Sequence, residues 1–195
     1  MTTQRQPTLV DAHVLNLQEA GFAVAELTDA DIDDYVVLVG SAYRGEASKQ
    51  GWTTEADLLD GQRLDAGMAR EMLAETGSSI ILVRSRDGEA MGSVYVRRPV
   101  DGVAYLGVLA VSPHGQGQGV GSALLSIAEA WVSERWGAHS LKMTVISKRE
   151  DLIAYYVRRG YELTGAVEPF PYGDDRFGVP KVDDLEFVEL VKALR

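Results

Sequence analysis

Hydrophobic residues recur along this chain with two different periods, one typical of strands and one typical of helices. A short hydrophobic run over Phe22–Leu27 predicts a strand. The three-to-four-residue spacing that follows, over 32–43, predicts a first helix that ends near Tyr43. Thr28 stands three residues before Asp31, which is the spacing of a capping box and marks where this helix begins.

The same reasoning assigns the rest of the chain. Gly77 ends a second predicted helix, and Asp-Gly dipeptides at 87 and 101 predict tight turns between consecutive strands. The predicted elements after Gly77 are strands over 79–84, 91–98 and 103–111, a long helix after residue 121, a strand over 141–146, a helix opened by a Ser147–Glu150 capping box and ended by Gly160, and strands over 161–167 and 185–191.

This order of elements predicts a mixed α/β or α+β sandwich built around one sheet. A length of 195 residues fits a single domain with a substantial core. We assign residues 21–195 to that domain. Residues 1–20 are either a loose leader or a short helix with Val10, Val14 and Leu17 along one side.

Composition and charge exclude several classes of function. The 29 acidic and 19 basic residues give a net charge of −10, which argues against binding to nucleic acid or to anionic membranes. The chain has no cysteine, so disulfides, thiolate-bound metals and cysteine-borne intermediates are excluded. Three scattered histidines make a metal site unexpected. Because no membrane-spanning run and no signal core are present, we expect a cytoplasmic protein.

Glycines are concentrated between a predicted buried strand and the longest predicted helix. They stand at every second position from Gly115 to Gly121. Glycine lets the backbone approach a ligand closely and adopt positive φ. The first N–H groups of a helix have no internal partner and lie at the positive end of its dipole. The segment therefore predicts a cradle for a phosphate or a diphosphate.

Two common nucleotide-binding motifs do not fit this segment. A P-loop needs a lysine directly before the serine at the helix start, but Gly121 precedes Ser122 here. A dinucleotide fingerprint needs a third glycine five residues after the first, and Val120 and Ser122 occupy the two candidate positions. The acidic residue that would bind a ribose is also missing at the end of the next predicted strand.

The Gln-x-x-Gly-x-Gly pattern that starts at Gln116 resembles the acyl-CoA pyrophosphate motif of the GNAT N-acetyltransferase superfamily. The preceding strand with Pro113, and the spacing Tyr156-x-x-x-Gly160 in a later helix, also resemble that family. The resemblance implies the GNAT fold, a single mixed and mostly antiparallel sheet that is splayed between its fourth and fifth strands and flanked by helices on both faces. It further implies that an acetyl group passes directly from the co-substrate acetyl-CoA to an amine, without an acyl-enzyme.

The resemblance also implies roles for individual residues. The amide of Leu109 is expected to donate to the thioester carbonyl, where one donor contributes roughly 3–4 kcal/mol, and Gly107 is expected to mark the bulge that opens the strand edge. Tyr156 is expected to protonate the departing thiolate, with Tyr155 as its competitor. The expected cofactor contacts are Leu109, Ala110, Val111, Gln116, Gly117, Gln118, Gly119, Val120, Gly121, Ser122 and Tyr156.

The sequence departs from the family pattern in two places. At the position where many members carry an asparagine this chain has Glu150, so Ser147 or Arg149 is expected to contact the pantetheine arm instead. The strand before the cradle contains no carboxylate, although an amine with a pKa of about 10.4 must lose a proton before it attacks. Glu46, Glu55 and a chain of water molecules remain as alternative proton acceptors.

Two loops rich in aromatic and charged residues are candidates for the acceptor site. The loop over 42–55 falls where the family builds this site, and the loop over 168–182 either lines the same pocket or forms a homodimer contact. The expected acceptor is a small-molecule primary amine, and the acidic balance mildly favours a cation. A protein or peptide N-acetyltransferase and a non-catalytic acyl-CoA sensor remain as alternatives. The expected acceptor contacts are Tyr43, Arg44, Glu46, Trp52, Glu55 and Tyr172.

Overall fold

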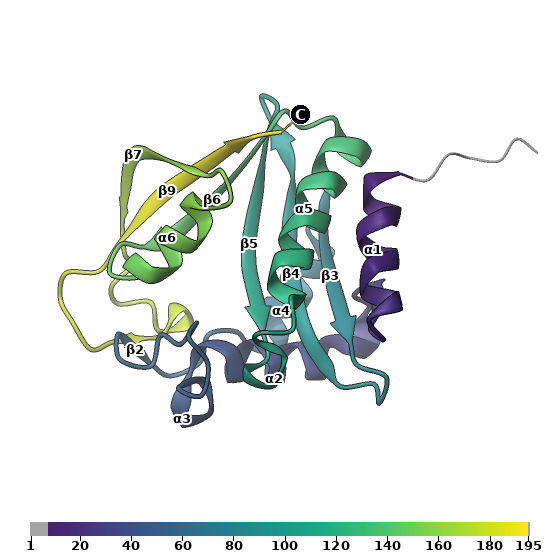
Figure 1. The fold of residues 1–195 in the computed structure, drawn as a ribbon. Helices are drawn as coiled ribbons and strands as arrows, with labels where there is room; N and C mark the ends of the chain where they lie inside the picture. Colours follow the sequence, from purple (N-terminus) through teal and green to yellow (C-terminus); the bar gives the residue numbers. More distant parts are fainter. Residues whose placement is uncertain (1–7, 195) are drawn as a thin grey trace, which may run out of the picture.

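A computed structural model describes residues 8–194, which form a seven-stranded sheet with helices on both faces (Figure 1). Every neighbouring pair of strands is antiparallel except β5 and β6, so the predicted mixed and mostly antiparallel sheet is confirmed. The strands, in their order across the sheet, are β1 (Ala23–Glu26), β3 (Ser78–Arg84), β4 (Ala90–Val100), β5 (Val103–Val111), β6 (Ser140–Ile146), β9 (Glu186–Ala193) and β7 (Glu162–Pro169).

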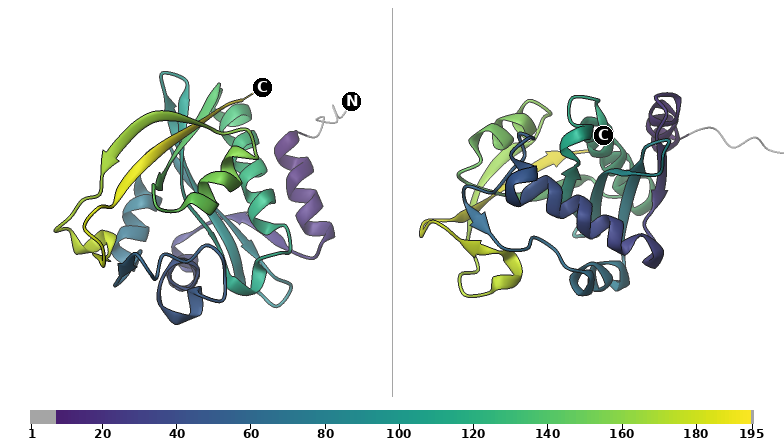
Figure 2. Two further views of the ribbon diagram at one scale, coloured as in Figure 1. Left: turned by 60° about the vertical axis from the view of Figure 1, so that its left-hand side comes forward. Right: turned by 90° about the horizontal axis from the view of Figure 1, so that it is seen from below.

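The helices divide between the two faces of this sheet (Figure 2). One face carries α1 (Leu9–Glu19), α5 (Val120–Trp136) and α6 (Glu150–Val157), and the other carries α2 (Ile32–Tyr43) and α4 (Ala66–Ala74). A one-turn helix, α3 (Gly45–Ser48), follows α2. The part of the predicted leader at residues 1–7 lies outside the described residues. No helix within residues 8–194 is long and apolar enough to cross a membrane.

The strand β3 shows how the two faces are filled. Successive side chains of a strand point to opposite faces, and Ile81 and Val83 accordingly pack in the core under α1 and α5, while Ile80 and Leu82 pack in the core under α2 and α4. All four side chains are buried. A continuous hydrophobic run thus predicts a strand that is covered on both faces.

The sheet is split between β5 and β6, as the family resemblance implied. These two parallel strands pair only where they begin, with Val103–Tyr105 opposite Ser140–Lys142. Past Tyr105, β5 stays paired with β4 and β6 stays paired with β9. The two strands therefore diverge toward the end of the sheet where the glycine-rich segment begins (Figure 1).

A bulge lies in the free part of β5, but not where the sequence predicted it. Ser93 pairs with Ala110 and Tyr95 pairs with Gly107, so β5 carries one residue more than β4 across this interval. Val108 takes up the extra length with a φ of +44°. A β-branched residue rarely adopts positive φ, which costs about 1–3 kcal/mol. The predicted bulge at Gly107 is therefore corrected to Val108–Leu109.

Two further local predictions have different outcomes. The capping box of Thr28 and Asp31 is present and opens a short 3₁₀ turn, Asp29–Asp31, that leads into α2. The Ser147–Glu150 box is wrong, because Arg149 is the residue that precedes α6 and no side chain caps this helix. Two-residue strands, β2 (Leu59–Asp60) and β8 (Val179–Pro180), pair with each other and tie the loop after α3 to the loop after β7.

Candidate active site

The start of α5 presents backbone groups that no side chain caps. Gly119 precedes the helix with a φ of +82°, and Gly117 has a φ of +80°. A β-carbon at either position would point into open space. No side chain caps the first turn. The leading N–H groups of this 17-residue helix are therefore available to an anion from outside the helix.

A cavity of about 320 Å³ opens in front of this helix start. Nine of the residues predicted to contact the cofactor or to act in catalysis line this cavity, whereas Ala110 and Gln118 do not. Ala110 is buried in the core under α2, and the Gln118 side chain donates to the carbonyl of His114. The lining residues are Tyr43, Trp52, Thr53, Leu109, Val111, Gly115, Gln116, Gly117, Gly119, Val120, Gly121, Ser122, Leu152, Tyr155 and Tyr156.

The side chain of Gln116 joins this cavity to the loop after α3. Its Oε1 accepts from the amide of Trp52 at 2.9 Å, and its Nε2 donates to the Thr53 hydroxyl at 3.1 Å. A β-carbon at Gly51 would lie 2.4 Å from Nε2, so this contact requires a glycine there. Gln116 thus holds the loop after α3 against the start of α5, a contact that the sequence does not predict.

A second and smaller cavity, of about 70 Å³, lies in the split between β5 and β6. Four residues line both cavities, namely Tyr43, Leu109, Leu152 and Tyr156. The two spaces therefore meet at the bulge of β5 and at the tyrosine of α6. The remaining residues of the small cavity are Glu55, Arg63, Leu106, Gly107, Val108, Met143, Thr144, Val145, Ile146 and Phe187.

Tyr156 lies at this junction with its ring buried against Tyr155 and Tyr161. Burial raises the pKa of its hydroxyl far above the ordinary value, and the neighbouring Tyr43 and Tyr155 raise it further. Within residues 8–194 this hydroxyl has no hydrogen-bond partner. Tyr156 is thus a protonated donor that faces an open space.

Tyr155, the competitor, has a different setting. Its ring lies between the indole of Trp52, at 5.1 Å between ring centroids, and the guanidinium of Arg159, at 3.5 Å. Its hydroxyl is 3.5 Å from that of Ser122 in the first turn of α5. Arg159 also donates to the Ser122 hydroxyl, at 2.8 Å. Tyr155 therefore lines the wall of the large cavity and does not line the small one.

The sequence predicts that Tyr43 contacts the acceptor, and in the structure its hydroxyl also binds the bulge of β5. The hydroxyl donates to the carbonyl of Leu109 at 2.6 Å, directly beside the strained Val108. Burial, followed by the nearby Glu55 carboxylate, raises the pKa of Tyr43 to about 12. The hydroxyl therefore stays protonated and holds the bulge in one geometry.

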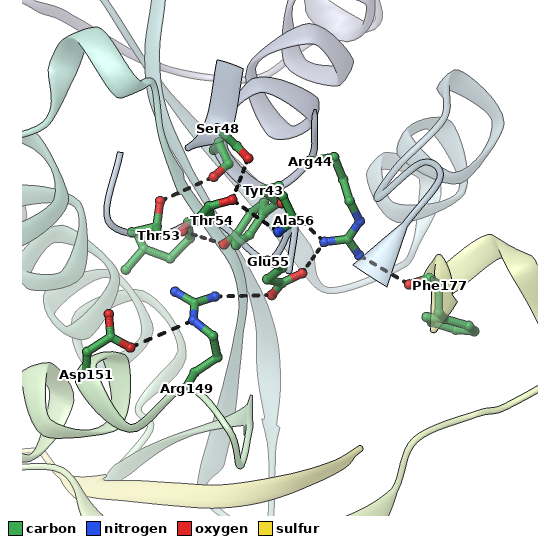
Figure 3. A network of polar contacts seen from close by, with 12 residues as sticks. Tyr43, Arg44, Ser48, Thr53, Thr54, Glu55, Ala56, Arg149, Asp151 and Phe177 are labelled. Atoms are coloured by element: carbon green, nitrogen blue, oxygen red, sulfur yellow. Dashed lines mark hydrogen bonds and ion pairs between the residues drawn. The ribbon is translucent and has the colours of Figure 1, made fainter. Parts of the chain in front are cut away.

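A chain of charged side chains runs through Glu55, which lines the small cavity (Figure 3). Glu55 accepts from Arg44 on one side and faces Nη1 of Arg149 at 3.6 Å on the other. Arg44 also donates to the carbonyl of Phe177 at 3.3 Å, and Nε of Arg149 lies 3.9 Å from Asp151. Among the described residues, Nε of Arg44 and both terminal nitrogens of Arg149 have no hydrogen-bond acceptor.

Several residues predicted for the site lie outside both cavities. Arg149 and Arg44 are buried in the charge network, and Ser147 bonds through its amide to Glu186. Glu46 is exposed and pairs with Lys49 at 2.7 Å. The Tyr172 hydroxyl is used within its own loop, where it donates to Val182 and accepts from the amide of Leu185.

The split sheet, the open helix start and the two joined cavities place this chain among proteins of the GNAT fold. The sequence matches the acetyltransferase (GNAT) family over residues 32–161, so the chain belongs to that family.

A curated relative agrees with this assignment. The chain is 31% identical to the mycothiol acetyltransferase of Clavibacter sepedonicus over 146 residues, which cover 73% of this chain and 43% of the relative. It therefore spans less than half the length of this curated relative.

Two solved structures are similar in fold. Nourseothricin acetyltransferase is 24% identical with a TM-score of 0.53, covering 62% of this chain and 67% of its own. The ribosomal-protein-S18-alanine N-acetyltransferase of Escherichia coli is 15% identical with a TM-score of 0.64, covering 89% and 94%. Their names point to different kinds of acceptor, and at these identities the likeness extends to the fold alone.

Proposed function

We propose that this chain is an N-acetyltransferase that moves an acetyl group from acetyl-CoA to the primary amine of a small molecule. The observation that carries the proposal is the meeting of two cavities at Leu109 and Tyr156. The larger cavity leads from the open start of α5 to this junction, and it receives the diphosphate and the pantetheine arm. The smaller cavity lies on the other side of the junction and receives the amine.

The reaction then follows from the residues at the junction. The amine nitrogen attacks the thioester carbon, and the carbonyl oxygen gains negative charge that the amide of Leu109 stabilises. The C–S bond breaks with its electron pair on sulfur, and Tyr156 gives its proton to that sulfur. The proton of the amine passes to water or to Glu55, which is the carboxylate that lines the small cavity among the described residues.

The setting of Tyr156 suits a general acid. Because burial raises its pKa, the phenol keeps its proton until a stronger base than solvent appears beside it. Burial at the same site also raises the basicity of the departing thiolate, so the phenol can give its proton to the sulfur as the C–S bond breaks. Tyr156 regains its proton from solvent after CoA leaves.

The test of this proposal measures free thiol released from acetyl-CoA over a panel of amines and peptides. We expect Tyr156→Phe to lower kcat by about 10²–10⁴-fold, the usual range for general acid–base catalysis, with little change in acetyl-CoA affinity. Tyr155→Phe is the matched comparison, because its hydroxyl faces only the large cavity. An unchanged kcat in Tyr156→Phe, or a larger loss in Tyr155→Phe, would contradict the assignment.

The size of the small cavity favours a small acceptor over a protein. Its volume is about 70 Å³, and the paired strands β2 and β8 lie between the two loops beside it. The curated relative also carries the name of a small molecule. Acetylation of peptides but not of small amines would favour the protein-acceptor alternative. Tight binding of acetyl-CoA with no thiol release from any amine would favour the sensor.

A further inference from the structure

Arg63 stands apart from the other charged residues around the acceptor cavity. It lies in the segment before α4, is half-buried, and lines the small cavity but not the large one. Its guanidinium lies 5.6 Å from the centre of the Tyr43 ring. Within residues 8–194 no carboxylate lies within ion-pairing distance of it, whereas seven of the twelve arginines in that range are ion-paired.

The charges behind Arg63 do not compensate it. Arg44 and Arg149 share the single buried carboxylate of Glu55, and Asp151, whose side chain is 60% exposed, lies 3.9 Å from Arg149. Three guanidiniums thus face one buried and one exposed carboxylate. Glu55 and Arg63 are the charged residues that line the small cavity among the described residues, and Glu55 is already shared by two arginines, so the Arg63 guanidinium is left for an anion.

The buried guanidiniums are also short of acceptors. Nε of Arg44 and the two terminal nitrogens of Arg149 lack hydrogen-bond partners among the described residues. Buried polar groups are normally paired, and an excess of buried charge of one sign is costly. An anion bound at Arg63 would offset this excess without having to touch the deeper residues.

On the basis of the proposed function, we propose that the acceptor amine also carries a carboxylate, and that Arg63 binds it. The planar guanidinium presents a fork of donors that matches a carboxylate in two parallel hydrogen bonds. The ring of Tyr43 supports the fork, while its hydroxyl stays on Leu109. A molecule held this way by its carboxylate places its amine toward the junction with the large cavity.

The remaining lining sets a limit on the acceptor. Eight of the fourteen residues that line the small cavity have aliphatic, methionine or phenylalanine side chains, including Leu106, Met143 and Phe187, and the volume is about 70 Å³. The acceptor class is therefore a small amino acid with a compact side chain. Under this proposal the acceptor is not the cation that the net charge of the whole chain favours, because charges close to a ligand affect it more than distant ones.

The test compares matched pairs of acceptors in the thiol-release assay with acetyl-CoA. The probes are the common amino acids with a primary amine, each beside its own amide, which lacks the carboxylate charge, at a pH above the pKa of both amines. We expect kcat/KM for the best amino acid to exceed that for its amide by about a hundredfold, as for loss of a charge-assisted pair. Arg63→Gln should lower the amino-acid value by a similar factor through KM and leave the amide value unchanged.

Two variants serve as controls. Arg63→Lys keeps the charge but loses the fork of donors, so its KM for the amino acid should lie between those of the wild type and of Arg63→Gln. Arg86→Gln removes an exposed arginine of the β3–β4 turn, outside both cavities, and should change nothing.

The outcomes separate this inference from the proposed function. Equal or better turnover of amides in the wild type, or a preference for amino acids that survives in Arg63→Gln, would overturn the carboxylate while leaving the acetyltransferase in place. A preference for succinyl-CoA with neutral amines that depends on Arg63 would also overturn it, because the anion would then belong to the acyl group. No thiol release from any amine and no binding of acetyl-CoA would overturn both.

Discussion

The two cavities that meet at Leu109 and Tyr156 are built in different ways. The proposed donor cleft includes the glycine-rich start of α5, where seven residues between Gly115 and Ser122 supply nearly half of the lining. The acceptor cavity is made of side chains from β5, β6, β9 and the segments around Glu55 and Arg63, which are far apart in the chain. Backbone groups stay in place when side chains are substituted, so a site built from them suits a ligand that does not change within a family. A site lined by side chains can change its ligand through a few substitutions.

The two regions also differ in charge. The donor cleft uses helix amides and glycines, and the nearest guanidinium, that of Arg159, lies over Tyr155. The acceptor side buries Arg44 and Arg149 against one glutamate. Substitutions on the acceptor side should therefore affect stability, whereas substitutions in the cradle should affect cofactor binding with little effect on stability.

The largest effect is expected on the acceptor side, from Glu55→Gln. This change leaves Arg44 and Arg149 buried with only the exposed Asp151 near Arg149, and breaking a buried ion pair typically costs about 3–5 kcal/mol of unfolding free energy. Thermal or denaturant unfolding measures the loss. Glu46→Gln is the matched control, because Glu46 is exposed and its pair with Lys49 is screened by solvent. Similar melting temperatures for the two variants would show that the buried network does not stabilise the fold.

The next effect is expected in the cradle, from Gly119→Glu. A carboxylate at this position faces the site of the diphosphate, and the backbone φ of +82° disfavours any side chain. We expect acetyl-CoA affinity to fall by about a hundredfold, or roughly 2.7 kcal/mol, in a calorimetric titration.

The control for the cradle is Gly88→Glu. Gly88 has a φ of +85° and open space around its β-carbon, as Gly119 has, but it lies in the turn between β3 and β4. The same strain and the same charge are thus introduced far from the cleft. An equal loss of affinity in both variants would mean that the start of α5 does not bind the cofactor.

A smaller effect is expected at the junction, from Tyr43→Phe. Loss of the hydrogen bond to the Leu109 carbonyl frees the bulge that orients the Leu109 amide. We expect kcat to fall by about tenfold, corresponding to roughly 1.4 kcal/mol of transition-state stabilisation, while acetyl-CoA affinity changes little. Tyr105 lies on β5, as Leu109 does, but outside both cavities, so Tyr105→Phe should leave kcat and acetyl-CoA affinity unchanged. A drop in affinity without a drop in kcat would place Tyr43 in binding instead.

The smallest effect is expected from pH. The pKa of Tyr43 is raised to about 12 and that of Tyr156 is raised further, so both phenols stay protonated through pH 10. The rate should therefore rise as the amine loses its proton, with no descending limb up to pH 10. A tyrosine with an ordinary pKa near 10 would have lost about half of its acid form by then. A descending limb below pH 10 in the kcat profile would contradict the protonated general acid.

The contrast between the two cavities also explains what the sequence could predict. The strands, the main helices and the cradle follow from local patterns, namely hydrophobic period, capping residues and closely spaced glycines. The bulge was placed at Gly107 because glycine is the usual residue for such geometry, but Tyr43 holds Val108 in it from a distant helix. The two-residue strands β2 and β8 are too short to show a period.

The acceptor side was predicted less well for a related reason. Arg149 was expected at the cofactor because of its position near the start of α6, yet it turns inward to Glu55, 94 positions earlier in the chain. Arg63 carries no local signal at all, since a single arginine in an irregular segment is usually a surface residue. Contacts between distant side chains depend on the packing of the whole fold, which one sequence does not reveal.

A crystal structure with bound CoA tests the central claim most directly. We expect the diphosphate on the amides of residues 116–122 and the thiol sulfur within hydrogen-bonding distance of the Tyr156 hydroxyl, at the junction of the two cavities. A sulfur atom bound elsewhere, or a diphosphate away from the start of α5, would contradict the claim that the two cavities form one reaction centre.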